Sequence, residues 1–200
     1  MVRAREAIRS RGGAARVNVF TRFLLAFYGV LTWRAVPVLP IEIMLLPRWS
    51  PFHLDKVAYW SRVVIVPLLV LMALRPRTLN PRRVDLRELF PEAAPAPAAA
   101  GGDAWARLFQ ALDVALKLAE PLLPEAARRR GLEVAEGFIV ERLNGEDGLG
   151  AIFPAMANAA MALAALGRPP DDPARRTAMA ALRRLLVTDG DEVRCQPCLS

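Results

Sequence analysis

The chain has 200 residues, enough to bury the core of one domain, and its 27 basic and 20 acidic side chains give a net charge of +7. Hydrophobic residues make up 54% of it, yet the longest apolar run, residues 63–74, is interrupted by Pro67. That run is too short to cross a bilayer, which takes about 20 apolar residues, and two cysteines do not form a disulfide framework.

The basic charge favours an anionic partner. No motif of a nucleic-acid-binding fold accompanies that charge, so a membrane surface is a better candidate than nucleic acid. Almost all of the cations are arginines, since Lys56 and Lys117 are the only lysines.

Residues 4–30 are predicted to be helical, with a break at Gly12-Gly13, because apolar side chains between Val19 and Tyr28 recur at helical spacing. Residues 33–60, which we name the proline-rich segment, hold three of the four tryptophans and four prolines: Pro37, Pro40, Pro47 and Pro51. Prolines so closely spaced exclude a regular helix. The many large apolar side chains exclude an ordinary surface loop, so a buried, irregular wall is predicted.

The remainder of the chain is predicted to be almost entirely helical. A helix is expected after Pro51 and up to Leu74, kinked or divided at Pro67. Residues 91–102 are of low complexity and are expected to form a flexible loop, and Asp103 is expected to be the N-cap of the next helix. Further helices are expected over about 105–120, 125–143, 155–166 and 173–187, followed by a turn at 188–192. Strand signals are nearly absent, which predicts an all-α fold.

Two polar residues of the proline-rich segment each have two interpretations. Glu42 is the lone acid in an aliphatic run, so it is either a functional carboxylate or the partner of Arg34, Arg48 or backbone donors. His53 has no histidine or cysteine at ligand spacing, so no metal site is predicted, and it is expected to cap the turn that follows Pro51. The tryptophans Trp49, Trp60 and Trp105 are expected to be packing residues.

The sequence Cys195-Gln196-Pro197-Cys198 has the spacing of a thiol–disulfide redox motif. Such a motif normally begins a helix that follows a strand in a βαβ context, which the surrounding sequence does not predict. A small thiol redox protein is therefore the weakest of the functional hypotheses.

Three long blocks, taken in order, resemble the bacterial squalene–hopene cyclases. They are WRAVPVLPIEIMLLPRWSPFHLDKVAYWSRVVIVPLLVL, GFIVERLNGEDGLGAIFPAMANAAMAL and VTDGDEVRCQPCLS. The resemblance covers nearly the whole chain and is weakest over residues 91–102. The glutamine–tryptophan repeat of that family is degenerate here, because Leu143 and Leu149 stand where glutamine and tryptophan are expected.

The resemblance implies an incomplete α/α-barrel that is part of one N-terminal barrel domain. Residues 1–200 would comprise helices with the proline-rich segment (1–90), the flexible loop (91–102) and helical repeats (103–200). It also implies a monotopic enzyme on the cytoplasmic side of the cytoplasmic membrane, which cyclises squalene to hopene or hopanol in hopanoid biosynthesis. The implied partners are a squalene-like polyprenoid and the bilayer surface, with a homodimer in the full-length family and neither a cofactor nor a metal.

The family's catalytic acid belongs to an aspartate-rich motif, and no Asp-x-Asp-Asp sequence occurs in these 200 residues. The chain by itself is therefore expected to be inactive. The alternative, from a different functional class, is a non-catalytic peripheral membrane or scaffold module derived from such a cyclase.

The resemblance also assigns candidate site residues. Trp33 matches a tryptophan that lines the substrate cavity, and Val38 matches the constriction through which substrate enters. Gln196, with Pro197 beside it, matches a glutamine at the end of the cavity where the final cation is quenched. The helix expected at 155–166 aligns with the membrane-contacting helix, whose lipid-facing residues would be Ala155, Met156, Met161, Leu163 and Leu166.

Overall fold

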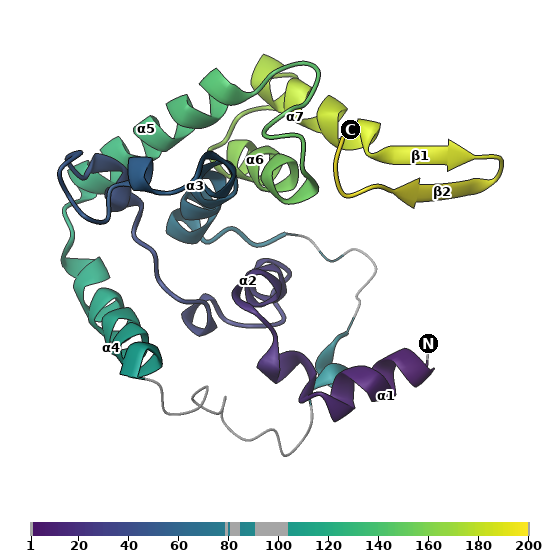
Figure 1. Cartoon of the computed structure of the whole chain (residues 1–200), viewed down its shortest axis with the longest axis horizontal. Helices are drawn as coiled ribbons and strands as arrows, with labels where there is room; N and C mark the ends of the chain where they lie inside the picture. The colour runs from purple at the N-terminus through teal and green to yellow at the C-terminus, as the bar shows by residue number, and fades with distance from the viewer. Residues whose placement is uncertain (1, 79, 81–84, 91–103, 200) are drawn as a thin grey trace. The chain divides into compact units, whose positions relative to one another are not determined.

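The computed structural model describes residues 2–78, 80, 85–90 and 104–199, and over these residues the helices and turns are accompanied by one β-hairpin (Figure 1). The predicted all-α class is confirmed. The helices are α1 Val2–Ser10, α2 Val19–Phe27, α3 Tyr59–Leu74, α4 Ala104–Ala119, α5 Glu125–Arg142, α6 Phe153–Ala165 and α7 Pro173–Arg184. The chain divides into two compact units, unit 1 (Met1–Val38 and Arg75–Pro121) and unit 2 (Leu39–Leu74 and Leu122–Ser200).

Unit 1 contains α1, α2 and α4. The predicted break between the first two helices is confirmed, because Gly12 adopts a positive φ of 96° after α1 ends at Ser10. Asn18 caps α2 by accepting a hydrogen bond from the Thr21 N–H at 2.9 Å. Phe23 on α2 is only 2% exposed and forms the centre of an aromatic cluster.

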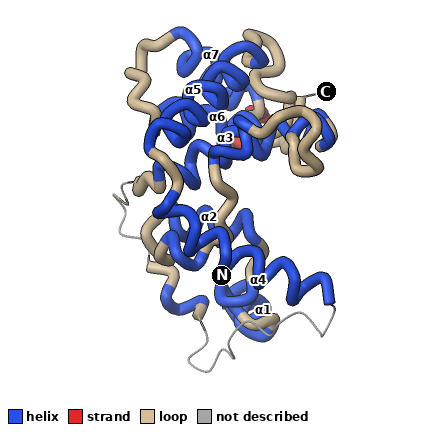
Figure 2. Tube along the Cα trace, turned by 90° about the vertical axis from the view of Figure 1, so that its left-hand side faces the viewer, coloured by secondary structure: helices blue, strands red, loops and turns tan. Residues whose placement is uncertain are grey.

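Unit 2 is built around α3, which packs against α5 and α6, while α6 also packs against α7 (Figure 2). Pro67 does not divide α3, which runs without interruption from Tyr59 to Leu74 and buries Pro67 almost completely. The middle of α5 approaches the short 3₁₀ turn Ile41–Leu45 at Gly131. A Cβ at Gly131 would lie 3.0 Å from the Ile41 carbonyl oxygen, so only glycine allows this approach without adjustment.

The proline-rich segment folds into three short 3₁₀ turns, Trp33–Ala35, Ile41–Leu45 and Leu54–Lys56, which confirms its irregular backbone. The prediction that it is a buried wall is only partly right. Ile41 is 1% exposed, but Trp49 is 82% exposed and Trp60 is 58% exposed. These two tryptophans are therefore not buried packing residues. Trp49 lies between the second and third 3₁₀ turns, where a backbone that turns every few residues directs neighbouring side chains to different sides, and Trp60 lies in the first turn of α3.

The antiparallel hairpin pairs β1 (Leu186–Asp189) with β2 (Glu192–Cys195) around a turn at Gly190. The turn was predicted and the strands were not, because two four-residue strands are too short to show a clear alternation. The expectations for residues 91–102, for Asp103 and for the Trp105 side chain lie outside what the structure describes.

Candidate functional site

Trp33, the predicted cavity tryptophan, lies in unit 1 in a short 3₁₀ turn and is partly exposed. Its ring meets Phe23 edge-on, with centroids 5.5 Å apart and an interplanar angle of 65°. Phe23 in turn stacks on Phe27 at 6.1 Å. These contacts fix the indole, because offset and edge-to-face pairs are the favoured aromatic geometries. The Trp33 Nε1 atom is buried, and no described residue accepts a hydrogen bond from it.

Val38, the predicted constriction residue, is partly buried in the same unit, five positions after Trp33. Its backbone N–H donates to the Asp113 Oδ1 atom on α4 at 2.8 Å, and the Lys117 Nζ atom lies 2.6 Å from Asp113 Oδ2. Sequence reasoning missed Asp113. Its only local signal is the favourable Asp–Lys pair four residues apart on a helix, which does not reveal a partner 75 residues away.

Gln196 and Pro197, the predicted residues at the cation-quenching end, lie in unit 2 just after β2. The Gln196 N–H donates to the Leu185 carbonyl at 2.8 Å, and the Pro197 carbonyl accepts from the Phe153 N–H at 2.9 Å. Gln196 is partly buried and Pro197 is exposed. The structure therefore ties this segment to the start of α6 and the end of α7 through its backbone.

The five residues expected to contact lipid lie on or just after α6, and they are not equally exposed. Ala155, Met156 and Leu163 are fully buried, while Met161 and Leu166 are partly exposed. The buried three are covered by the rest of unit 2, so lipid contact through α6 stays a prediction for Met161 and Leu166 alone. No helix in the described part of the chain is long and apolar enough to cross a membrane.

Glu42 lies on the 3₁₀ turn that packs against α5, and its carboxylate oxygens are buried without a hydrogen-bond partner among the described residues. Its nearest described cation is Arg128, whose Nε atom is 3.7 Å from Glu42 Oε1. Arg48, one of the partners suggested for Glu42, bonds to Asp55 at 3.1 Å instead. Arg128 comes close because Gly131 lets the turn approach α5.

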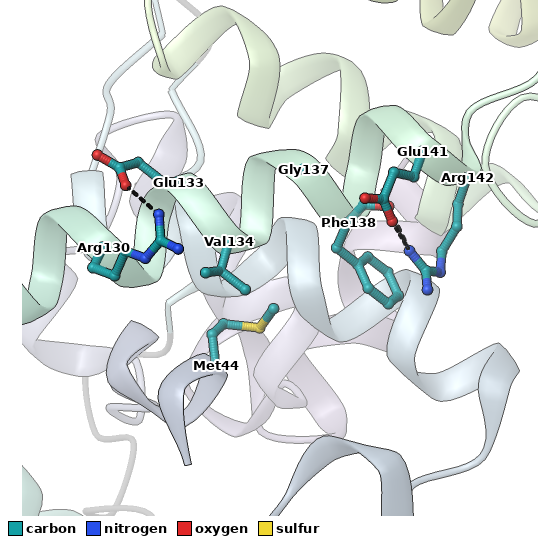
Figure 3. Close-up of a pocket in the computed structure, with 8 residues that line it drawn as sticks. All are labelled: Met44, Arg130, Glu133, Val134, Gly137, Phe138, Glu141 and Arg142. Carbon is teal, nitrogen blue, oxygen red and sulfur yellow. Dashed lines mark hydrogen bonds and ion pairs between the residues drawn. The ribbon is translucent and has the colours of Figure 1, made fainter. Parts of the chain in front are cut away.

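A shallow pocket of about 380 Å³ lies along α5 in unit 2 (Figure 3). Met44, Val134 and Phe138 supply its apolar lining. The charged side chains are paired with one another, with Arg130 2.9 Å from Glu133 and Arg142 3.1 Å from Glu141 (Figure 3). Paired surface charges with no nucleophile among them do not form a reactive site.

His53 and the two cysteines have structural explanations. The predicted cap is confirmed, because His53 Nδ1 accepts a hydrogen bond from the Asp55 N–H at 3.0 Å. Cys195 and Cys198 are free and exposed, and the strand that precedes them belongs to a hairpin rather than to a βαβ unit. A thiol redox site has no support in this geometry.

The sequence model of the squalene-hopene cyclase N-terminal domain matches residues 1–191 of the chain. Over its whole length the chain is 53% identical to the squalene–hopene cyclase of Bradyrhizobium diazoefficiens and 54% identical to the probable squalene–hopene cyclase of Sinorhizobium fredii. A squalene–hopene cyclase of Alicyclobacillus acidocaldarius is 34% identical over 82% of the chain, which covers 26% of that protein.

The chain spans 31% of the Bradyrhizobium relative and 32% of the Sinorhizobium relative, about a third of each. The family match agrees with the helical fold and with the three blocks that carry the resemblance. This chain belongs to the squalene–hopene cyclase family and corresponds to the family's N-terminal domain.

Proposed function

We propose that this chain serves as the N-terminal part of an enzyme that cyclises squalene to hopene or hopanol in hopanoid biosynthesis. The observation that carries the proposal is the match of residues 1–191 to the cyclase N-terminal domain, together with 53% identity to a squalene–hopene cyclase along the whole chain. The reaction is an intramolecular rearrangement, in which a protonated terminal double bond starts the closure of several rings.

The aromatic cluster around Trp33 suits that chemistry. A carbocation in a dry cavity needs groups that stabilise positive charge without trapping it, and aromatic faces do so by about 2 kcal/mol or more when desolvated. Phe23, which itself stacks on Phe27, holds the indole in one orientation. A preorganised environment of this kind stabilises the transition state at no cost in reorganisation.

Further roles in the proposal follow the matched positions. Val38 would narrow the entry to the cavity, and Gln196 with Pro197 would lie where the last cation loses a proton or takes up water. The acid that starts the reaction is not proposed to lie in these 200 residues, because they contain no Asp-x-Asp-Asp sequence.

A chimera tests the function. In it, this chain replaces the matching region of the Bradyrhizobium enzyme, and gas chromatography measures the products formed from squalene. We expect the chimera to form hopene and the isolated chain to form none. An inactive chimera that is folded would contradict the proposed function, and product from the isolated chain would contradict the assignment of the acid to another region.

In the same chimera, Trp33→Ala is expected to slow cyclisation or to release incompletely cyclised products. Phe20→Ala, on α2, is the control, because Phe20 is 52% exposed and neither a cavity role nor bilayer contact is proposed for it. If the two variants formed the same products, Trp33 would have a packing role only.

We also propose that the chain lies on a bilayer surface, whether within a cyclase or as a non-catalytic module. The observation that favours this is the exposure of large aromatic side chains in unit 2: Trp49 is 82% exposed, Phe52 69% and Trp60 58%. Tryptophan is enriched at membrane–water interfaces because its ring is both apolar and polar.

Vesicle sedimentation tests this second proposal. Trp49→Ser combined with Phe52→Ser should weaken binding to phosphatidylglycerol-containing vesicles. Val193→Ser, at a 64% exposed position on the hairpin, is the matched control and should bind like the unsubstituted chain. Equal binding by both variants would show that Trp49 and Phe52 do not contribute to lipid contact.

A further inference from the structure

The contact between Asp113 and Val38 joins two parts of unit 1 that lie 75 residues apart in the sequence. The carboxylate receives the Val38 N–H at 2.8 Å through one oxygen and the Lys117 ammonium at 2.6 Å through the other. Asp113 and Lys117 are only 27% and 35% exposed. Hydrogen bonds that involve ionised groups are shorter and stronger than neutral ones, and partial burial protects them from screening by salt.

The sequence around Val38 explains why its backbone needs such a partner. Pro37 and Pro40 have no N–H, so the chain at this point can form neither a helix nor a strand ladder. The preceding donor, the Val36 N–H, bonds to the Trp33 carbonyl at 3.1 Å. The Val38 N–H therefore takes an acceptor elsewhere, because a donor that is partly removed from water loses free energy when it has no partner. Asp113 is that acceptor.

The orientation of α4 also points to this contact. Most amphipathic helices turn their apolar side to the protein and their charged side to water. Here Leu108 and Leu118 are 55% and 72% exposed, whereas Asp113 and Lys117, on the other side of the helix, are partly buried. The charged side of α4 is the side that reaches Val38.

We propose that Asp113, held in place by Lys117, is a positioning residue for substrate entry. It fixes the backbone at Val38 and thereby sets the width of the constriction that Val38 forms. This inference rests on the proposed function, which supplies the role of Val38. The substrate is a linear, methyl-branched polyprenoid, which enters by one end, so a constriction of fixed width favours its passage in an extended conformation.

The experiment uses the chimera described above with Asp113→Ala, Asp113→Asn and Lys117→Met. Steady-state kinetics with squalene gives kcat and KM, and hydrogen exchange gives the protection of the Val38 amide. For Asp113→Ala we expect KM to rise and the protection of the Val38 amide to fall, each roughly tenfold, while kcat stays unchanged. A change of this size corresponds to the loss of one charge-assisted hydrogen bond. Asp113→Asn keeps an acceptor oxygen but loses the ion pair, so it should be intermediate, as should Lys117→Met.

Asp191→Asn, in the exposed hairpin turn, is the matched control and should change neither quantity. An unchanged KM in Asp113→Ala would overturn the inference, as would a parallel loss of kcat and thermal stability, which indicates a merely structural role. Should Asp113→Ala fail to fold, an unchanged KM in both Asp113→Asn and Lys117→Met would overturn it instead. An inactive unsubstituted chimera contradicts the proposed function, whereas an active chimera with a normal KM in every variant contradicts this inference alone.

Discussion

Asp172 connects the start of α7 to the preceding turn through its carboxylate. It caps α7 by accepting the Arg175 N–H at 3.1 Å, and it accepts a second hydrogen bond from Arg168, also at 3.1 Å. Arg168 also reaches Glu136 on α5 at 2.7 Å. The hydrogen bond from the Arg175 backbone is the main cause that lowers the pKa of Asp172 below its ordinary value, and Arg168 adds to it.

A lowered pKa in the folded state predicts how stability depends on pH. The charged carboxylate stabilises the fold at pH values above its pKa in the unfolded chain, and this contribution is lost as the pH falls through the lower pKa of the folded state. Asp172→Asn should therefore lower the melting temperature at pH 7 by a few degrees and have little effect near pH 2. Thermal unfolding by circular dichroism checks this, with exposed Asp171→Asn as the control. A deficit of equal size at both pH values would show that charge is not the cause.

Gly150 shows a second constraint at the residue scale. Its φ is +72°, and a Cβ at this position would lie 2.8 Å from Val63 Cγ2 on α3. Gly150→Ala should destabilise the chain by about 2 kcal/mol or more, because a left-handed conformation costs about 1–2 kcal/mol for an L-residue before any clash is counted.

Alanine variants at two other glycines, compared in denaturant titrations, separate the backbone cost at Gly150 from the cost of the steric clash. Gly190 has a φ of +58° with open space around it, so its alanine variant should show the backbone cost alone. Gly145 has open space without a positive φ and should be close to neutral. The Gly150→Ala variant should be the least stable of the three and the Gly145→Ala variant the most stable. Any other order would contradict this explanation.

At the scale of elements, α6 acts as the central helix of unit 2. It packs against both α3 and α7, and Met156 contacts Ala181 and Leu185 in a cluster that excludes water. Its many alanines let the neighbouring helices come close, since a small side chain leaves little distance between helix axes. An apolar helix can be buried in protein or placed in lipid, and the packing of α6 supports the first of these.

Leu163→Ala should lower the free energy of unfolding by about 2–5 kcal/mol, because it removes a fully buried side chain and leaves a cavity. Met161→Ala, on the same helix but partly exposed, should cost clearly less. Urea unfolding gives the stability, and vesicle sedimentation is measured in parallel. If the Leu163→Ala variant kept its stability but lost vesicle binding, the result would indicate that α6 contacts lipid and is not a core helix of unit 2.

At the scale of the whole molecule, the net charge of +7 is carried almost entirely by arginine. Near an anionic bilayer each basic residue contributes about 1 kcal/mol, an attraction that falls off within the Debye length of about 8 Å at physiological ionic strength. Charge and exposed aromatic side chains would then both contribute to binding.

We therefore expect binding to anionic vesicles to weaken markedly as NaCl rises from about 0.05 M to about 0.5 M, as the Debye length shortens. Binding to vesicles of neutral lipid should be weak at all salt concentrations. Sedimentation assays measure both. The absence of lipid association at low salt would count against the bilayer proposal, and salt-independent binding would assign it to apolar contact alone.

Local sequence determined much of this molecule. The helices, the break at Gly12 and the cap at His53 follow from periodicity, glycine conformation and side-chain hydrogen bonding within a few residues. Three blocks of sequence were enough to indicate the family, which the match to residues 1–191 shows.

Only the tertiary structure decided which apolar residues are inside. Trp49 and Leu163 are both apolar in sequence, yet one is 82% exposed and the other fully buried. The partners of buried charges also come from distant positions, since Glu42 lies near Arg128 and Val38 bonds to Asp113. Periodicity describes one element at a time, whereas burial and pairing depend on which elements meet, and that is determined by the packing of the whole chain.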